Sequence, residues 1–128
     1  MNVALIESAY EAWNRHDADA LVAITHPDVE IAPLVMGAIS AGPWHGHDGV
    51  RKLVADAQDR WAEFQIECER VLTFGERAVA LVHVEVSLRP GGPSVTGDIA
   101  HVIEFEDGRA RRFTAYRSRA EAVAVVES

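Results

Sequence analysis

Residues 78–89 read Ala-Val-Ala-Leu-Val-His-Val-Glu-Val-Ser-Leu-Arg, with the period of two that is typical of a β-strand. Three further segments of the same character lie near it, at residues 64–74, 94–105 and 109–117. Their links carry turn chemistry: Gly-Glu, Pro-Gly-Gly-Pro and Asp-Gly. Because short links join consecutive strands, the sequence predicts a four-stranded antiparallel meander.

Before residue 62 the apolar residues recur every three or four positions, which predicts helices. The first helix would reach about residue 16 and bury one face: Val3, Ile6, Tyr10 and Trp13. Asp17 is expected to cap a second short helix that ends at His26-Pro27, and Asp48 to cap a third helix that reaches Trp61. Residues 28–34 read as a short strand, residues 35–46 as a long loop, and a capping-box pattern from Ser118 predicts a tail helix.

Three helices followed by a meander predict an α+β fold in a single domain, residues 1–128, which suits one core. If the sheet curls around the helices, a cone forms that closes at one end and opens at the other. Twelve basic against twenty acidic residues give a net charge of −8, which argues against nucleic acid and anionic membranes as partners. The first residues lack the features of a secretory signal, and no apolar run approaches the ~20 residues of a membrane helix, so a cytoplasmic location is expected.

Five segments carry a resemblance to a known family: residues 10–17 (YEAWNRHD), 26–30 (HPDVE), 44–51 (WHGHDGVR), 105–109 (FEDGR) and 116–118 (YRS). Together they resemble the SnoaL-like branch of the nuclear-transport-factor-2-like superfamily. The resemblance implies a cone-shaped, curved antiparallel sheet packed on three N-terminal helices, a cystatin-like α+β barrel. It also implies an apolar pocket between helices and sheet, and a homodimer formed through the outer face of the sheet. The fold hosts polyketide cyclases, isomerases, epoxide hydrolases, dehydratases and proteins without chemistry.

Two better-known members of the superfamily do not fit at their catalytic positions. Similarity to ketosteroid isomerase would need a carboxylate where the chain has Ala32 and an acid where it has His101. Similarity to limonene epoxide hydrolase would need an Arg-x-Asp pair where the chain has His83-Val84-Glu85, and an Asp where it has Ala115. Neither mechanism is expected unchanged, but the second comparison predicts that His83 and Glu85 point into the pocket.

The candidate catalytic residues are therefore His101, Glu85 and His83. Residues i and i+2 share a strand face, so His83 and Glu85 lie side by side, with Val82, Val84 and Val86 on an outer, dimer-forming face. A carboxylate beside a histidine fixes its tautomer and raises its basicity, as acid/base catalysis requires. His101 would be the general acid or base, and shares a face with Ile99, Ile103 and Phe105.

The expected ligand is a small apolar organic molecule, with no cofactor and no metal. Its pocket would be shaped by Tyr10, Trp13, Met36 and Trp44. The reaction would be an isomerisation, cyclisation, dehydration or hydration. Several alternatives stay open: the three valines face inward and His83 and Glu85 are solvated, His101 is a core histidine, or the two histidines and Glu85 bind a metal. The protein could also bind a ligand without catalysis, or be a dimer with a collapsed pocket.

Overall fold

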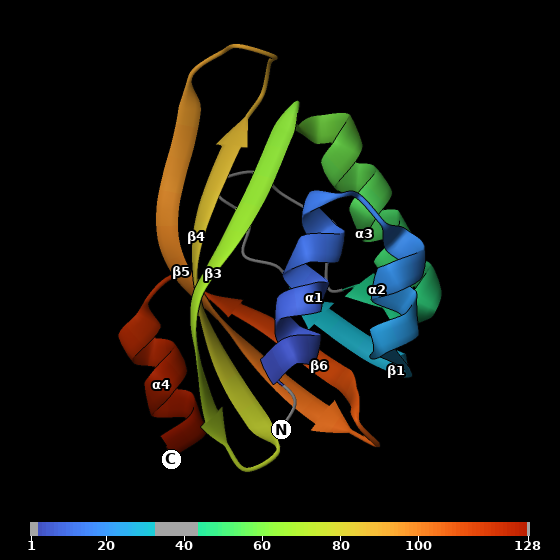
Figure 1. Cartoon of the computed structure of the whole chain (residues 1–128), viewed down its shortest axis with the longest axis vertical. Coiled ribbons are helices and arrows are strands. Elements are labelled where there is room, and N and C mark those ends of the chain that lie inside the picture. The colour runs from blue at the N-terminus through green and yellow to red at the C-terminus, as the bar shows by residue number, and fades with distance from the viewer. Residues whose placement is uncertain (1–2, 33–43, 128) are drawn as a thin grey trace.

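Three helices form one layer of the computed structural model, which describes residues 3–32 and 44–127 (Figure 1). They are α1 (Val3–Asn14), α2 (Ala18–Ile24) and α3 (Gly46–Arg60). α1 buries Ile6 and Tyr10, as its spacing predicts, whereas Val3 is exposed, contrary to the prediction. The predicted cap of α2 is confirmed, because the Asp17 side chain accepts a hydrogen bond from the Ala20 amide at 3.1 Å.

The start of α3 differs from the prediction. The helix begins at Gly46, two residues before Asp48, and its N-cap position is His45, whose side chain makes no capping bond. Gly46 has φ +72°, in the left-handed region that glycine adopts without strain. A Cβ at this position would also lie 3.3 Å from the Pro27 carbonyl oxygen. The chain therefore turns into the helix at the glycine, and Asp48 lies in the first turn.

The second layer is a six-stranded mixed sheet in the order β2-β1-β6-β5-β4-β3. Its strands are β1 (Thr25–Ala32), β2 (Trp44–His45), β3 (Glu63–Phe74), β4 (Arg77–Ser87), β5 (Ser94–Glu106) and β6 (Arg109–Tyr116). The predicted meander is confirmed, since β3 to β6 pair antiparallel in sequence order. Beyond that prediction, β1 pairs parallel with β6, and β2 adds an antiparallel edge. The sheet bends around α1 to α3 (Figure 1).

Two predicted local signals at the C-terminal end of the sheet are confirmed. Asp107 and Gly108 both have positive φ, at 54° and 76°, as a tight hairpin turn between β5 and β6 requires. Ser118 accepts a hydrogen bond from the Glu121 amide at 3.2 Å and caps a fourth helix, α4 (Arg119–Glu127). None of the helices within residues 3–32 and 44–127 is long and apolar enough to cross a membrane.

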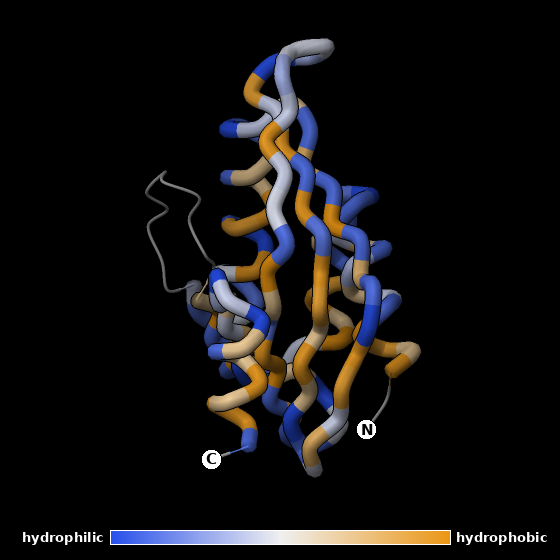
Figure 2. Tube along the Cα trace, turned by 90° about the vertical axis from the view of Figure 1, so that its left-hand side faces the viewer, coloured by the Kyte–Doolittle hydropathy of each residue, from blue (hydrophilic) through white to orange (hydrophobic). Residues whose placement is uncertain are grey.

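The two faces of the sheet have different covers. The inner face packs against α1 and carries the main core, to which β4 contributes its even-numbered residues from Ala78 to Val86. On the outer face α4 covers one end, where Ala122 and Val126 pack against Val79, Ala100 and Val102. Figure 2 views the molecule from the side that carries α4, with apolar and polar segments alternating along the strands. Along β4, even-numbered side chains therefore point to the main core and odd-numbered side chains point to the outer face.

Candidate functional site

A cavity of about 190 Å³ lies between the inner face of the sheet and the helices α1 to α3. Most of its lining is apolar and comes from both layers, including Ile6 on α1, Val54 on α3, Val84 on β4 and Phe113 on β6. An apolar cavity of about 150 Å³ is large enough to hold benzene. The space therefore suits a small organic molecule.

His101 is the polar centre of this cavity. It lies in β5 with 5% of its surface exposed, and its cavity-lining neighbours on the strand are Ile99, Ile103 and Phe105, as predicted. Its Nδ1 lies 2.8 Å from the hydroxyl oxygen of Tyr10, which α1 brings across the core. The imidazole also packs against the Phe113 ring, with the centroids 4.4 Å apart. Packing and the hydrogen bond together fix the orientation of the ring.

Burial keeps both members of this pair neutral. It lowers the pKa of His101 from 6.5 to about 3, because the imidazolium would have to leave water. Burial also raises the pKa of Tyr10 well above its usual value, with a smaller contribution from Cys68. The phenol is the stronger acid of the two groups, so we assign Tyr10 as the donor to Nδ1, and this assignment puts the ring proton of His101 on Nε2. Within the described part of the chain no group accepts a hydrogen bond from Nε2, which leaves that N–H for a ligand.

Of the residues predicted to shape the pocket, the structure places two in the cavity lining and one outside it. Tyr10 and Trp13 line the cavity. Trp44 is not among the lining residues; it lies on β2 and packs against the cluster of Val29, Ile31 and Val50. Met36 lies outside the described residues.

His83 and Glu85 do not lie in the cavity, so their predicted placement is wrong. Val82, Val84 and Val86 occupy the inner face instead, each at most 3% exposed, and are not an outer dimer-forming surface. Successive residues of a strand point to opposite faces, so His83 and Glu85 lie on the face opposite to the three valines.

On the outer face His83 donates a hydrogen bond from Nδ1 to Asp98 at 2.8 Å, and Glu85 accepts one from Ser94. The bond to Asp98 raises the pKa of His83. Because the sheet separates His83 and Glu85 from His101, the three residues form neither an acid/base set nor a metal site.

Sequence reasoning missed two charged residues of the cavity lining, Asp56 and Arg60. Both are on α3, and Nε of Arg60 lies 3.0 Å from each carboxylate oxygen of Asp56. Their side chains are 29% and 43% exposed, so they lie where the cavity meets solvent. The available signal was the spacing of four, which pairs opposite charges on one helix face directly before Trp61.

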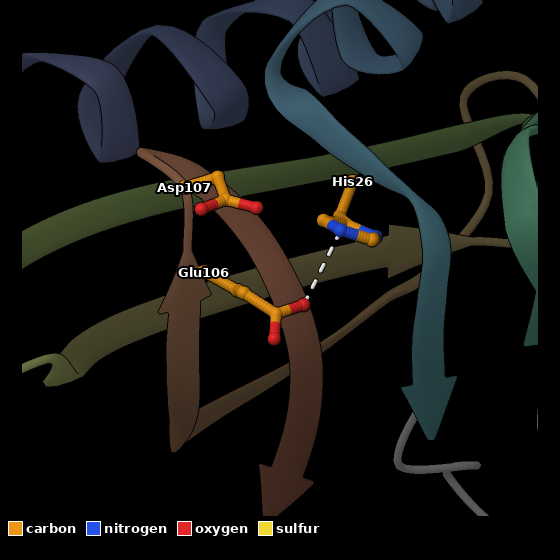
Figure 3. Close-up of side chains that lie close together, drawn as sticks. All are labelled: His26, Glu106 and Asp107. Atoms are coloured by element: carbon orange, nitrogen blue, oxygen red, sulfur yellow. Dashed lines mark ion pairs between the residues drawn. The ribbon is translucent and has the colours of Figure 1, made fainter.

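A further cluster of His26, Glu106 and Asp107 lies where β1 passes the turn between β5 and β6 (Figure 3). Their potential ligand atoms lie within 4.8 Å of one another, a spacing compatible with a metal ion. However, Nδ1 of His26 accepts the Asp28 amide at 3.0 Å, so the ring proton is on Nε2, which faces Glu106 at 3.2 Å. A metal would need that nitrogen without its proton. The cluster is better described as a polar support of the turn.

Comparison with known proteins agrees with this architecture. The SnoaL-like domain family matches residues 6–113. An NTF2-like protein of unknown function from Burkholderia pseudomallei shares 30% identity, with all of both chains covered and a TM-score of 0.79. TerC, crystallised with polyporic acid, shares 24% identity over 98% of each chain, with a TM-score of 0.78.

A more distant structural relative is an epoxide hydrolase of the LEH-like type from M. tuberculosis. It shares 18% identity over 98% of this chain and 88% of its own, with a TM-score of 0.71. At this identity the likeness shows the fold alone. No protein with a curated description matches the sequence.

Proposed function

The chain belongs to the SnoaL-like domain family, and we propose that its cavity binds a small, mainly apolar organic molecule on which His101 and Tyr10 act without a cofactor. The observation that carries the proposal is the hydrogen bond between these two side chains inside a mostly apolar cavity. The reaction is an isomerisation, cyclisation, dehydration or hydration that is accelerated by a hydrogen bond to an oxygen of the ligand.

The chemistry of the pair follows from its neutrality. Tyr10 donates to Nδ1 of His101, and the N–H at Nε2 donates to a carbonyl, epoxide or hydroxyl oxygen of the ligand. Where negative charge grows on that oxygen in the transition state, a fixed donor in a water-poor cavity stabilises it, an effect worth about 3 kcal/mol for one donor in comparable sites. Complete proton transfer through the pair would leave a buried tyrosinate, which the raised pKa of Tyr10 opposes. His101 therefore serves as a hydrogen-bond donor, with Tyr10 taking the orienting role first expected of Glu85 and His83.

A second candidate function is ligand binding without catalysis. The neutral state of His101 favours binding without catalysis, because a histidine with a pKa of about 3 is a weak base at neutral pH. In that case the N–H at Nε2 only orients the bound molecule.

The first experiment is a thermal-melt screen of the purified protein against small ketones, epoxides, lactones and phenols. A ligand at 100 times its Kd stabilises the folded state by about 2.7 kcal/mol, which raises the Tm of a domain of this size by several degrees. Each stabilising compound is then incubated with the protein, and product formation is followed by NMR. A screen in which no compound shifts the Tm contradicts the proposed function.

Variants of the pair separate the two candidates. We expect His101→Ala to lower turnover of a stabilising compound by about 10²-fold or more, the cost of removing one such donor. Tyr10→Phe keeps the ring in place and should lower turnover less, through the lost orientation of the imidazole. His83→Gln, on the outer face, is the matched control and should leave turnover unchanged. Binding without any turnover by the unaltered protein favours the non-catalytic function.

A further inference from the structure

Two polar pairs lie at separate places in the cavity lining. One is the neutral pair of Tyr10 and His101, and the other is the ion pair of Asp56 and Arg60. Among the described residues of the lining, Asp56 and Arg60 alone carry charged side chains, because His101 is neutral. The remainder of the lining is almost entirely hydrocarbon. A ligand that fills the cavity therefore meets two different kinds of polar contact.

Register along β4 shows that the two places are far apart. His101 is paired with Ala80, whereas the cavity extends to Val86, which is paired with Phe64 on β3. α3 ends near Val86, because the amide of Ala62, just after the helix, donates a hydrogen bond to the carbonyl of Ser87 at 2.8 Å. Ala80 and Val86 are six steps apart along the strand, roughly 20 Å between backbone positions. Side chains from both ends shorten the gap, yet only an elongated ligand touches both.

Arg60 is arranged to donate hydrogen bonds to a ligand. Asp56 occupies its Nε edge, with 3.0 Å to each carboxylate oxygen, which holds the guanidinium plane in place. Within residues 3–32 and 44–127 no group accepts a hydrogen bond from the terminal nitrogens Nη1 and Nη2. Their parallel N–H groups match the two oxygens of a carboxylate, the geometry in which arginine binds acids most strongly. Because the whole chain carries a net charge of −8, any attraction of an acid to this cavity must be local to Arg60.

We infer that Arg60 forms a carboxylate subsite at the mouth of the cavity, so that the ligand is an elongated, mainly apolar organic acid. Its carboxylate binds Nη1 and Nη2 of Arg60, its apolar body fills the cavity, and an oxygen farther along the molecule accepts the N–H of His101. The inference rests on the proposed function, since it names the class of ligand for the same cavity. Asp56 is a positioning residue in this arrangement, because it holds Arg60 through Nε.

The test uses benzoylalkanoic acids, which carry a ketone oxygen and a carboxylate joined by a chain of adjustable length. The affinities of benzoylpropanoic and benzoylhexanoic acid, and of their methyl esters, are measured by calorimetry with the purified protein. We expect the longer acid to bind at least about tenfold more tightly than its ester, because only the acid gains a charge-assisted bidentate contact. The shorter acid should show a smaller preference, because its carboxylate lies three methylene groups closer to its ketone oxygen and reaches less far toward Arg60.

Arg60→Gln should remove the preference for the longer acid and leave the affinity of the ester within about twofold. Arg60→Lys should keep part of the preference, because the charge remains while the fork of N–H groups is lost. Arg51→Gln is the matched control: Arg51 is also an exposed arginine of α3 and pairs with Asp19. Arg51→Gln changes the net charge of the chain by the same amount as Arg60→Gln and should keep the preference for the longer acid over its ester.

Other outcomes overturn the inference in distinguishable ways. If acid and ester bind equally to the unaltered protein, the carboxylate subsite is wrong while the proposed function stands. If Arg51→Gln and Arg60→Gln weaken acid binding alike, the effect is general charge and the subsite is again wrong. If the esters and the acids all fail to bind, both the subsite and the proposed ketone-binding function are contradicted.

Discussion

His101 and His83 lie on neighbouring strands of one sheet, and the two faces of that sheet give them opposite properties. On the inner face, burial lowers the pKa of His101 to about 3, and its partner is a phenol. On the outer face, a hydrogen bond from His83 to Asp98 raises the pKa of His83, and the pair is exposed to water. The same side chain is thus a neutral donor on one face and a readily charged group on the other.

This difference shows why chemistry at a ligand belongs to the inner histidine. A neutral imidazole that cannot collect a proton from water keeps a fixed N–H for a ligand oxygen. Its position among hydrocarbon side chains also makes that hydrogen bond stronger than it would be in water. His83 shares its polar contacts with solvent, and the backbone of the sheet separates it from the cavity.

The largest expected effect comes from placing a charge on the inner face. Val82 is fully buried in the main core, and Val82→Asp should destabilise the fold by about 4 kcal/mol or more, because a carboxylate would be buried without a partner. Glu85→Ser, on the opposite face of the same strand, should change stability by no more than about 0.5 kcal/mol. Urea unfolding of both variants measures the difference. Similar small effects in the two variants would contradict the assignment of the faces.

A smaller effect is expected from acid acting on His101. Because its folded pKa is lowered from 6.5 to about 3, the unfolded chain binds the proton more readily between these values. Stability is therefore retained above pH 6.5 and decreases as the pH falls below it, by about 2 kcal/mol between pH 7 and pH 5 from this residue. Carboxylates add their own acid dependence, so the measurement compares unfolding of the unaltered protein with that of His101→Ala at both pH values. Equal slopes would show that His101 is not buried in the neutral form.

Local signals in the sequence predicted much of the fold, because each acts over a few residues. Asp17, Ser118 and the turn at residues 107–108 all satisfy nearby backbone groups or backbone angles, and all three are confirmed. Asp48 shows the limit of such signals. A capping residue two positions inside the helix looks the same in sequence as one at its start. The turn at Gly46 is set by a positive φ and by the distant Pro27 carbonyl, which leaves little room for a Cβ.

The prediction that His83 points into the cavity rests on a likeness to an epoxide hydrolase, and the pairing of β4 with β5 opposes it. The six residues 88–93 join β4 to β5, with Ser87 paired to Ser94. An even loop of this kind pairs each odd-numbered residue of β4 with an even-numbered residue of β5, and paired residues share a face. His83 therefore lies beside Asp98, and His101 beside Ala80. The pairing that follows from the loop length can be read from the sequence alone. The contact between Tyr10 and His101 cannot, because it depends on how α1 crosses the sheet.

The smallest expected effect is the titration of His83, which sharpens the contrast between the two histidines. In a pH titration followed by NMR of the imidazole signals, His83 should titrate above the usual value of about 6.5, because Asp98 accepts a hydrogen bond from its protonated ring. Asp98→Asn should bring the midpoint of His83 down toward that value, while the signals of His101 show no protonation between about pH 5 and pH 8 in either protein. His83→Gln should change the Tm by no more than about 2 °C, since the pair is exposed to solvent. If His101 titrates near 6.5 alongside His83, the two faces do not differ in the way that the proposed chemistry requires.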